Sequence, residues 1–206
     1  MSERTLVIDT ATAACSVALI EGGEVIAAAH EIVGRGHAEH LLPMIAALPQ
    51  GGQAKQVLVD CGPGSFTGIR VGLAAARALG LGWAAAVRGY SSLALIAARA
   101  FADAPGLGAV AVVLEGGHGE VFMQSFAASP FAALAPLASR PPAEARAAAG
   151  DLPLVGSGVR WLDPEAVSAP LALPVAADLP LLPPAFAMLP ARPVYGRPPD
   201  AKPKVR

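Results

Sequence analysis

The chain opens with runs of apolar, β-branched residues that are separated by turn signals. Residues 5–10 and 15–20 predict buried strands, and residues 25–32 predict a third strand that is weakened by alanine. Two adjacent glycines lie in the connection at residues 21–24, and glycine adopts positive φ at little cost, which predicts a tight hairpin turn. We therefore expect a three-stranded meander at the start of the chain.

Helical and strand patterns alternate after this meander. The patterns predict helices over residues 38–48, 69–83 and 92–101 and strands over residues 57–60 and 85–87. Ser91 and Ser92 are expected to cap the third helix. A strand–turn–strand pattern then returns at residues 109–114, 116–119 and 120–126, followed by a strand that runs into a glycine turn at 154–158. This recurrence predicts a duplicated αβ unit, with one subdomain at residues 1–103 and a second at 104–206.

Composition narrows the class of protein. The 206 residues are 54% hydrophobic and 15% charged, which excludes a disordered chain, and no long uncharged apolar run lacks a proline, so we expect no membrane span. The start of the chain lacks the pattern of a signal peptide, and Cys15 and Cys61 are expected as free thiols in the cytoplasm. A net charge of -1 disfavours autonomous binding of nucleic acid.

Proline and basic residues gather toward the end of the chain. Of the 20 prolines, 16 lie from Pro130 onward, so the last third is expected to use short elements and loops. Residues 192–206 hold five basic residues and one acid. Such a tail is either a solvated terminus or a basic strap that contacts RNA or an acidic partner surface.

The most distinctive local pattern is the glycine-rich turn Cys61-Gly-Pro-Gly-Ser-Phe-Thr-Gly-Ile-Arg70, between a predicted strand and a predicted helix. No Lys-Ser/Thr pair follows Gly68, so the turn is not a phosphate loop, and Ser65 lacks the flanking glycines of a nucleophile elbow. Two interpretations stay open. Either the turn is rigid and caps the helix, or it contacts an anion or nucleotide through Gly64, Ser65, Thr67 and Arg70.

A second pattern lies where the first strand ends in a carboxylate. Asp9, Thr10 and Thr12 stand where actin-like ATPases and sugar kinases wrap phosphates. Those enzymes normally have glycine directly after the aspartate, whereas the Cβ atoms of Thr10 and Ala11 hinder a close backbone approach. We therefore predict a degenerate, non-hydrolysing phosphate loop.

His37 and His40 are spaced to share one helix face. A zinc site needs three or four ligands, but Glu39, the obvious third, points elsewhere and His118 is far along the chain. We therefore expect no metal site and histidines that face solvent or an interface.

The two long helices indicate a protein–protein surface. Gly72, Ala76 and Gly80 form a stripe of small residues that predicts close helix–helix packing, and residues 38–48 are apolar nearly all round. Such surplus apolar surface is typical of a contact with a partner, and the alternative is a single well-covered core within this chain.

Taken together, the motifs resemble the TsaB family, a bacterial subunit of the machinery that forms threonylcarbamoyladenosine in tRNA. The GPGSFTG block with the arginine that follows is the most specific match, and the other matches keep the family's order nearly end to end. They lie at residues 8–12, 14–19, 37–39, 41–45, 62–73, 91–93, 119–122, 155–158, 193–195 and 197.

The resemblance implies an α/β, actin-like ATPase (ribonuclease H-like) fold with two subdomains and mixed sheets. It also implies a non-catalytic subunit that activates the TsaD transferase, which modifies the adenosine beside the anticodon of tRNAs reading codons that begin with A. TsaE would dock on the pair, tRNA would be reached through the complex, and the chain alone would form a homodimer. The partner interface is expected at His40, Leu41, Met44, Ile45, Leu48, Arg70, Gly72, Leu73, Ala76, Arg77 and Gly80.

No cofactor of the chain's own is expected, and ATP or ADP would bind at the junction with TsaD. The chain departs from the family's pattern at Glu115, Gly116 and Gly117, where the family usually carries Asp-Ala-Arg, and in a short connection between Met44 and Val57. Two rival functions remain. One is an actin-fold ATPase or kinase that acts alone through Asp9 and the turn at residues 62–68, and the other is a metallohydrolase that uses the two histidines.

Overall fold

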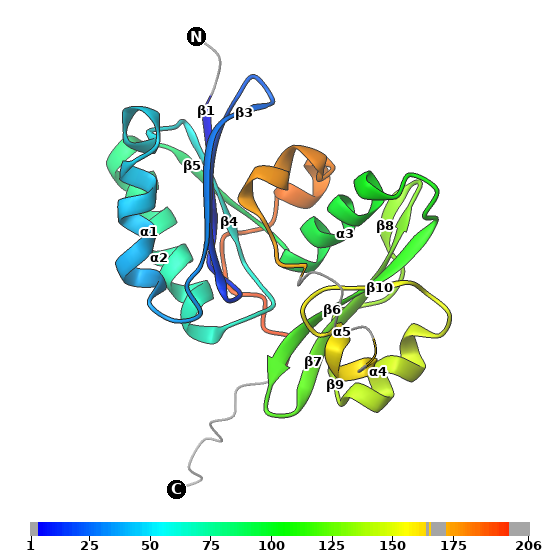
Figure 1. Ribbon diagram of the computed structural model, residues 1–206. Coiled ribbons are helices and arrows are strands. Elements are labelled where there is room, and N and C mark those ends of the chain that lie inside the picture. The colour runs from blue at the N-terminus through cyan, green and yellow to red at the C-terminus, as the bar shows by residue number, and fades with distance from the viewer. Residues whose placement is uncertain (1–3, 164, 166–171, 198–206) are drawn as a thin grey trace, which may run out of the picture.

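A computed structural model describes residues 4–163, 165 and 172–197 of the chain. Within these residues the strands form two mixed sheets (Figure 1). The first sheet has the order β3-β2-β1-β4-β5, in which β1 and β3 run antiparallel to β2 while β4 and β5 run parallel to β1. Its strands are β1 (Arg4–Asp9), β2 (Ala14–Glu21), β3 (Glu24–Ile32), β4 (Gln56–Asp60) and β5 (Ala86–Tyr90).

The second sheet repeats four strands of the first. It has the order β10-β6-β7-β8, with β9 also paired to β7. β10 is parallel to β6, whereas β6, β7 and β8 are antiparallel neighbours, so the order and directions match β4-β1-β2-β3. The strands are β6 (Ala109–Gly117), β7 (Glu120–Ala128), β8 (Phe131–Ala133), β9 (Ala138–Arg140) and β10 (Leu154–Val155). The duplicated unit and the actin-like fold class are thereby confirmed.

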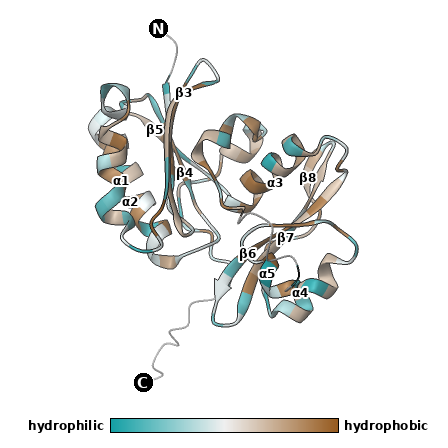
Figure 2. Ribbon diagram, viewed as in Figure 1, coloured by the Kyte–Doolittle hydropathy of each residue, from teal (hydrophilic) through white to brown (hydrophobic). Residues whose placement is uncertain are grey.

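Helices form layers around and between the sheets (Figure 1). α1 (His37–Ala46) and α2 (Phe66–Trp83) cover one face of the first sheet, and α3 (Ser92–Asp103) lies between the two sheets with the 3₁₀ segment η3 (Ala176–Leu181). α4 (Pro142–Ala149) and α5 (Val159–Leu162) cover the far face of the second sheet. The short 3₁₀ segments η1 (Pro49–Gly52) and η4 (Pro184–Ala187) complete the layers. Figure 2 shows apolar residues on α1, α2 and α3 alike.

Most predicted elements appear within a few residues of their expected bounds, with two corrections. α2 begins at Phe66 rather than residue 69, because the Ser65 hydroxyl accepts a hydrogen bond from the amide of Gly68 and so caps the helix earlier. α3 lacks a side-chain cap from Ser91, since the Ser92 hydroxyl instead donates to Asp60.

The last described segment returns to the first sheet. Leu189 pairs with Gly89 of β5, the amide of Val194 donates to the carbonyl of Cys61, and the guanidinium of Arg77 donates to the carbonyl of Ala191. The predicted division of the chain at residue 103 stays a prediction. The part of the predicted basic tail beyond residue 197 lies outside the described residues, and no helix within them is long and apolar enough to cross a membrane.

Candidate functional site

The loop between β1 and β2 is filled from within the protein. The amide of Ser65 donates to the carbonyl of Ala11 over 2.6 Å, and the imidazole Nε2 of His37 donates to the carbonyl of Thr12 over 2.8 Å. The amides of residues 33 and 34 both donate to the carbonyl of Ala13. The amides of Ala11 and Ala14 are also bonded within the chain, to the Asp9 carboxyl and the Thr12 hydroxyl, so these two donors of the loop are taken up by its own side chains.

The glycines of the GPGSFTG turn permit this packing. A Cβ atom on Gly64 would overlap the carbonyl oxygen of Ala11, and one on Gly68 would overlap that of Thr10. The Thr10 hydroxyl also donates to the carbonyl of Gly68 over 2.7 Å. The turn thus closes directly over the Asp9–Thr12 loop. The anion contact predicted for Gly64, Ser65, Thr67 and Arg70 stays a prediction.

Asp9 itself lies beneath this closure. It is completely buried, and its carboxyl hydrogen-bonds to that of Asp60, which is equally buried. The Tyr90 hydroxyl donates to Asp9 over 3.0 Å, while Asp60 accepts from the amide of Gly62 over 2.7 Å and from the hydroxyl of Ser92 over 2.5 Å. Burial raises the pKa of both carboxyls, and that of Asp9 rises well above its usual range.

We place the shared proton on Asp9, because Asp60 receives the larger set of donors and lies at the N-terminus of α3, both of which stabilise an ionised carboxylate. Asp9 therefore has no open path to a ligand. Its carboxyl links the β1–β2 loop to the glycine-rich turn through the bond to Asp60.

The two histidines of α1 serve separate contacts. His37 is buried and Nε2 also reaches the carbonyl of Ala14 at 3.2 Å, whereas His40 is exposed and pairs with Glu31 at 3.1 Å. Among the described residues no group of three or more His, Cys, Asp or Glu side chains is placed to hold a metal ion.

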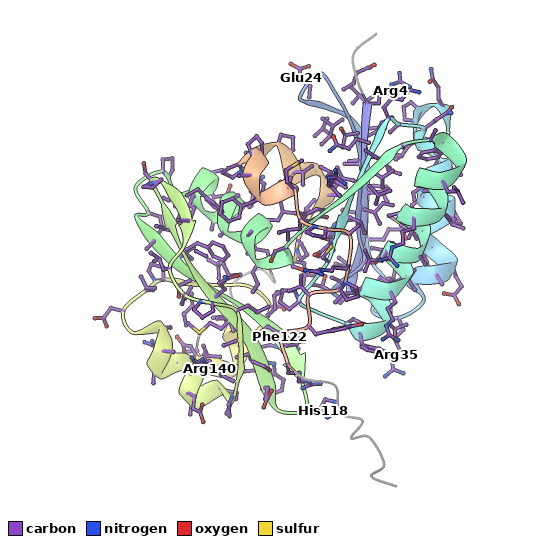
Figure 3. All side chains as sticks on the ribbon, turned by 180° about the vertical axis from the view of Figure 1, so that it is seen from behind. Arg4, Glu24, Arg35, His118, Phe122 and Arg140 are labelled. Atoms are coloured by element: carbon purple, nitrogen blue, oxygen red, sulfur yellow. The ribbon has the colours of Figure 1, made fainter. Side chains whose placement is uncertain are left out.

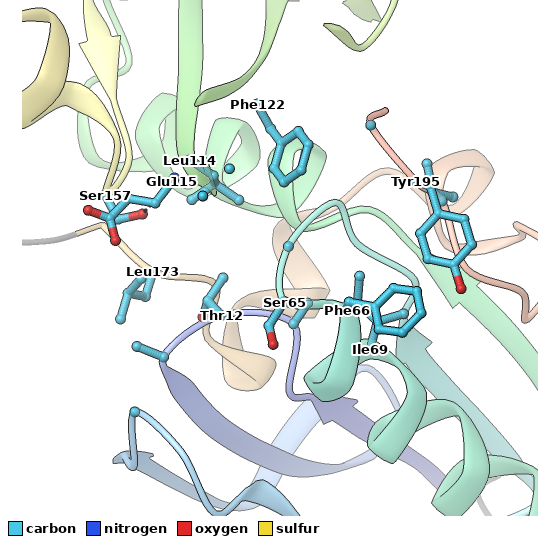
Figure 4. Close-up of a pocket in the computed structure, with 18 of the residues that line it drawn as sticks. Thr12, Ser65, Phe66, Ile69, Leu114, Glu115, Phe122, Ser157, Leu173 and Tyr195 are labelled. Carbon is cyan, nitrogen blue, oxygen red and sulfur yellow. Dashed lines mark hydrogen bonds between the residues drawn. The ribbon is translucent and has the colours of Figure 1, made fainter. Parts of the chain in front are cut away.

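A cleft of about 1190 Å³ opens between the two sheets, beyond the closed loops (Figure 4). Its walls come from the β1–β2 loop, the start of α2, the β6–β7 hairpin and the returning segment at residues 194–197. Thr12 and Ser65 lie on one side, and Leu114, Glu115 and Phe122 on the other (Figure 4).

An aromatic cluster stands at the rim of this cleft. The rings of Phe66 and Tyr195 are stacked with centroids 5.7 Å apart, and the guanidinium carbon of Arg70 lies 3.6 Å from the centroid of the Phe66 ring. Arg70 also donates to the Tyr195 hydroxyl through Nε and Nη2, at 3.3 and 3.2 Å. We call these three residues the rim cluster.

The residues predicted for a partner interface divide into two groups. His40, Arg70 and Arg77 are exposed, whereas the others lie in the chain's own core: Leu41, Met44, Ile45, Leu48, Gly72, Leu73, Ala76 and Gly80. The stripe at Gly72, Ala76 and Gly80 faces the first sheet, where a Cβ on Gly72 would lie 2.5 Å from the Thr10 hydroxyl. The interpretation of this stripe as a helix–helix contact with a partner is therefore wrong, because the small residues bring α2 close to its own strands.

The outward side of α1 and α2 is apolar and small. Leu42 is 53% exposed and Leu81 is 87% exposed. The exposed residues around them are Pro43, Ala46, Ala47, Ala74 and Ala78. We call this set, with Leu42 and Leu81, the α1/α2 face.

Sequence reasoning missed Asp60, Tyr90 and the pairing of Phe66 with Tyr195. Asp60 directly precedes the glycine-rich turn, and this placement was the only signal for it in the sequence. Nothing in the sequence links Tyr195 to α2, because 125 positions separate it from Arg70.

The chain is similar to proteins that are described by a role in forming threonylcarbamoyladenosine in tRNA. Residues 25–129, about half of the chain, match the family model described as TsaD, tRNA N6-adenosine threonylcarbamoyltransferase. The tRNA threonylcarbamoyladenosine biosynthesis protein TsaB of Escherichia coli is 35% identical over 128 residues, which are 60% of this chain and 54% of that protein. The TsaB protein of Haemophilus influenzae is 41% identical over 101 residues, 47% of this chain and 42% of that one. The chain thus spans about half the length of these curated relatives.

Solved structures extend the likeness over the whole fold. A structure described as YeaZ from Pseudomonas aeruginosa superposes with a TM-score of 0.76 at 27% identity, covering 95% of this chain and 100% of that one. A second, described as an uncharacterized protein with similarity to peptidase YeaZ from the same organism, gives a TM-score of 0.78 at 29% identity, with coverage of 96% and 100%.

Proposed function

The chain belongs to the TsaB family, and from this premise we propose that it is a non-catalytic subunit in the formation of N6-threonylcarbamoyladenosine on tRNA. Its catalytic partner would be a TsaD-like transferase that acts on the adenosine beside the anticodon of tRNAs reading codons that begin with A. The chain's contribution would be to bind this partner and hold it in an active state, with a TsaE-like ATPase docking on the pair.

The observation that carries this proposal is the closure of the phosphate loop. The segment at residues 64–68 occupies the space in front of Asp9, and the carbonyls of Ala11 and Thr12 are already bonded to Ser65 and His37. An ATPase needs backbone amides and a carboxylate that reach the phosphates and their metal ion. Here Asp9 is completely buried and bonded to Asp60 and Tyr90, which counts against the rival ATPase or kinase function.

The α1/α2 face supports the partner-binding part of the proposal. Arg70 and Arg77 are also exposed on α2, but the alanine, proline and leucine side chains of the α1/α2 face are short or apolar and allow another backbone to approach closely. We propose that this face binds the TsaD-like partner and that the chain alone uses it to form a homodimer. ATP or ADP would bind at the junction, with one wall from the start of α2.

The decisive test is reconstitution with the TsaD-like protein of the same cell. The two proteins are co-purified, and modified adenosine in tRNA is measured by mass spectrometry with and without this chain. We expect association and a strong dependence of modification on the chain, while the chain alone neither hydrolyses ATP nor modifies tRNA. ATP turnover by the chain alone would favour the rival enzyme.

Two arginine substitutions locate the partner surface. Ala46→Arg and Ala78→Arg add a bulky charge to the α1/α2 face and should abolish association, because both positions are exposed and disturb no core contact. Ala147→Arg, at an exposed position of α4 on the other subdomain, is the matched control. Equal partner affinity of all three variants would refute this surface.

A further inference from the structure

The rim cluster is held rigidly and yet leaves its rings exposed. Phe66 is 54% exposed and Tyr195 is 46% exposed, although stacking and the two bonds from Arg70 fix their orientation. Tyrosine and other aromatic side chains are enriched where a partner or ligand covers the ring.

A purely structural role does not account for this exposure. The returning segment is already attached to the first sheet by the bond from the Val194 amide to the Cys61 carbonyl and by the bond from Arg77 to the Ala191 carbonyl. Neither bond needs an aromatic ring at position 66 or 195. The returning segment is therefore attached to the first sheet without the stacked rings.

The charge around the cluster points to an anionic ligand. Arg70 forms no ion pair with a carboxylate of the described residues, since its partners are the Tyr195 hydroxyl and the Phe66 ring. Three arginines line the cleft. Arg160 pairs with Glu115 and Arg197 lies 3.9 Å from Glu120, so Arg70 is the lining arginine that has no carboxylate partner among the described residues. Figure 3 shows Arg35 and His118 at the same end of the molecule.

A nucleotide would use both the exposed aromatic rings and the arginine beside them. Its base stacks on aromatic rings and on a guanidinium plane, and its phosphate pairs with arginine. We propose that the rim cluster binds an unpaired nucleotide of RNA, with the base on the Phe66 and Tyr195 rings and a phosphate on Arg70. This inference rests on the proposed function for the choice of RNA as the polymer. Aromatic and arginine residues also mark protein contacts, but the Arg70 guanidinium, which has no carboxylate partner among the described residues, favours a phosphate-bearing ligand.

The test measures RNA binding by the full chain, alone and in complex with the TsaD-like partner. The probe is a fluorescein-labelled anticodon stem–loop, compared with a fully paired duplex of the same length. Phe66→Leu and Tyr195→Leu keep apolar bulk and remove the ring, and Arg70→Ala removes the guanidinium. Each should weaken binding of the stem–loop about tenfold, the effect of losing one stacked base or one phosphate contact.

Two matched controls lie away from the rim cluster. Arg146→Ala removes an exposed arginine of α4, and Leu134→Ala removes an exposed leucine near the second sheet, and both should leave RNA affinity unchanged. Ultraviolet cross-linking should attach the stem–loop to peptides that contain Phe66 or Tyr195. The duplex should bind more weakly than the stem–loop, because its bases are not free to stack.

Several outcomes would overturn the proposal. Unchanged affinity of the ring variants, or cross-links confined to other peptides, would remove the RNA contact. Full competition by AMP at the concentration of the RNA would make this a mononucleotide site instead. Loss of partner affinity in the ring variants with unchanged RNA affinity would make the cluster a protein contact. The α1/α2 variants test partner association without touching the rim cluster, so they distinguish a failure of the proposed function from a failure of the RNA contact.

Discussion

The carboxyl group of Asp9, at the end of β1, hydrogen-bonds to the carboxyl group of Asp60, at the end of the parallel neighbour β4, and both side chains are completely buried. Asp9 is followed by the β1–β2 loop, and Asp60 by the glycine-rich turn that closes over this loop. Through Ser92 the pair also reaches α3, which packs between the two sheets. One buried acid pair therefore joins the elements that form the floor of the cleft.

The stability of the protein should fall as the pH rises, in part because of this pair. Burial raises the pKa of Asp9 well above 3.8 in the folded protein, so above pH 3.8 the folded state keeps a proton that the unfolded chain releases. The free energy of unfolding should then fall by about 1.4 kcal/mol per pH unit until the pH reaches the folded pKa.

Asp9→Asn isolates this contribution, because asparagine can donate to Asp60 and accept from Tyr90 at every pH. Urea unfolding at a series of pH values should show a flatter profile for this variant than for the natural chain. Asp103→Asn is the control, since Asp103 is an exposed carboxylate paired with Arg99. A parallel profile for the natural chain and Asp9→Asn would show that Asp9 is ionised when folded.

Gly64→Ala should destabilise the fold strongly. The added Cβ would overlap the backbone carbonyl of Ala11, which cannot yield without opening the loop, and we expect a loss of about 3 kcal/mol. Gly82→Ala is the matched control, because no atom lies within 4 Å of its Cβ in the helix α2, and it should stabilise by about 0.5–1 kcal/mol. Chemical denaturation measures both, and equal effects would mean that the GPGSFTG turn does not press on the loop.

Local patterns in the sequence predicted the strands and helices well because each pattern reports its own neighbourhood. Runs of apolar, β-branched residues predicted β1 and β2, and the turn glycines at residues 22 and 23 predicted the hairpin that follows. The start of α2 was missed because Phe66 and Thr67 lie in a glycine-rich run. A cap from Ser65 or Thr67 was one interpretation of the turn, and the folded backbone shows that Ser65 forms it.

The sequence could not show in the same way which face of a helix or loop packs against the chain's own core. A stripe of small residues such as Gly72, Ala76 and Gly80 packs equally well against a partner helix and against the chain's own sheet. Likewise, no local pattern distinguishes Asp60 from an exposed turn aspartate, because its burial depends on α3 and β1. The rim cluster joins residues 66 and 195, a contact made only by the tertiary fold.

The isolated chain should form a homodimer through the α1/α2 face, and a charge there should dissociate it. Leu42→Asp places a carboxylate at a position that is 53% exposed in the single chain, so the monomer should keep its stability while the dimer loses at least 1–2 kcal/mol. Leu134→Asp, at a leucine that is 56% exposed near the second sheet, is the control. Sedimentation velocity should show a monomer for Leu42→Asp alone. If Leu134→Asp dissociates the dimer instead, the interface lies on the other subdomain.

The two histidines of α1 should differ sharply in their effect on stability. His37 is buried and its Nε2 donates to the carbonyls of Thr12 and Ala14, so His37→Ala leaves two buried carbonyls without this donor and should cost about 2 kcal/mol. His40→Ala removes only an exposed pair with Glu31 and should change stability by less than about 0.5 kcal/mol.

This difference also separates loop support from metal binding. A metallohydrolase that used both histidines would lose its metal with either substitution, and added zinc would raise the thermal midpoint of the natural chain but of neither variant. If His37 only supports the loop, zinc should leave the thermal midpoints of the natural chain and of both variants unchanged. Only His37→Ala should then have a lower midpoint than the natural chain. Thermal unfolding with and without zinc, on protein purified without an affinity tag, decides between the two, because they demand opposite responses to zinc from the natural chain.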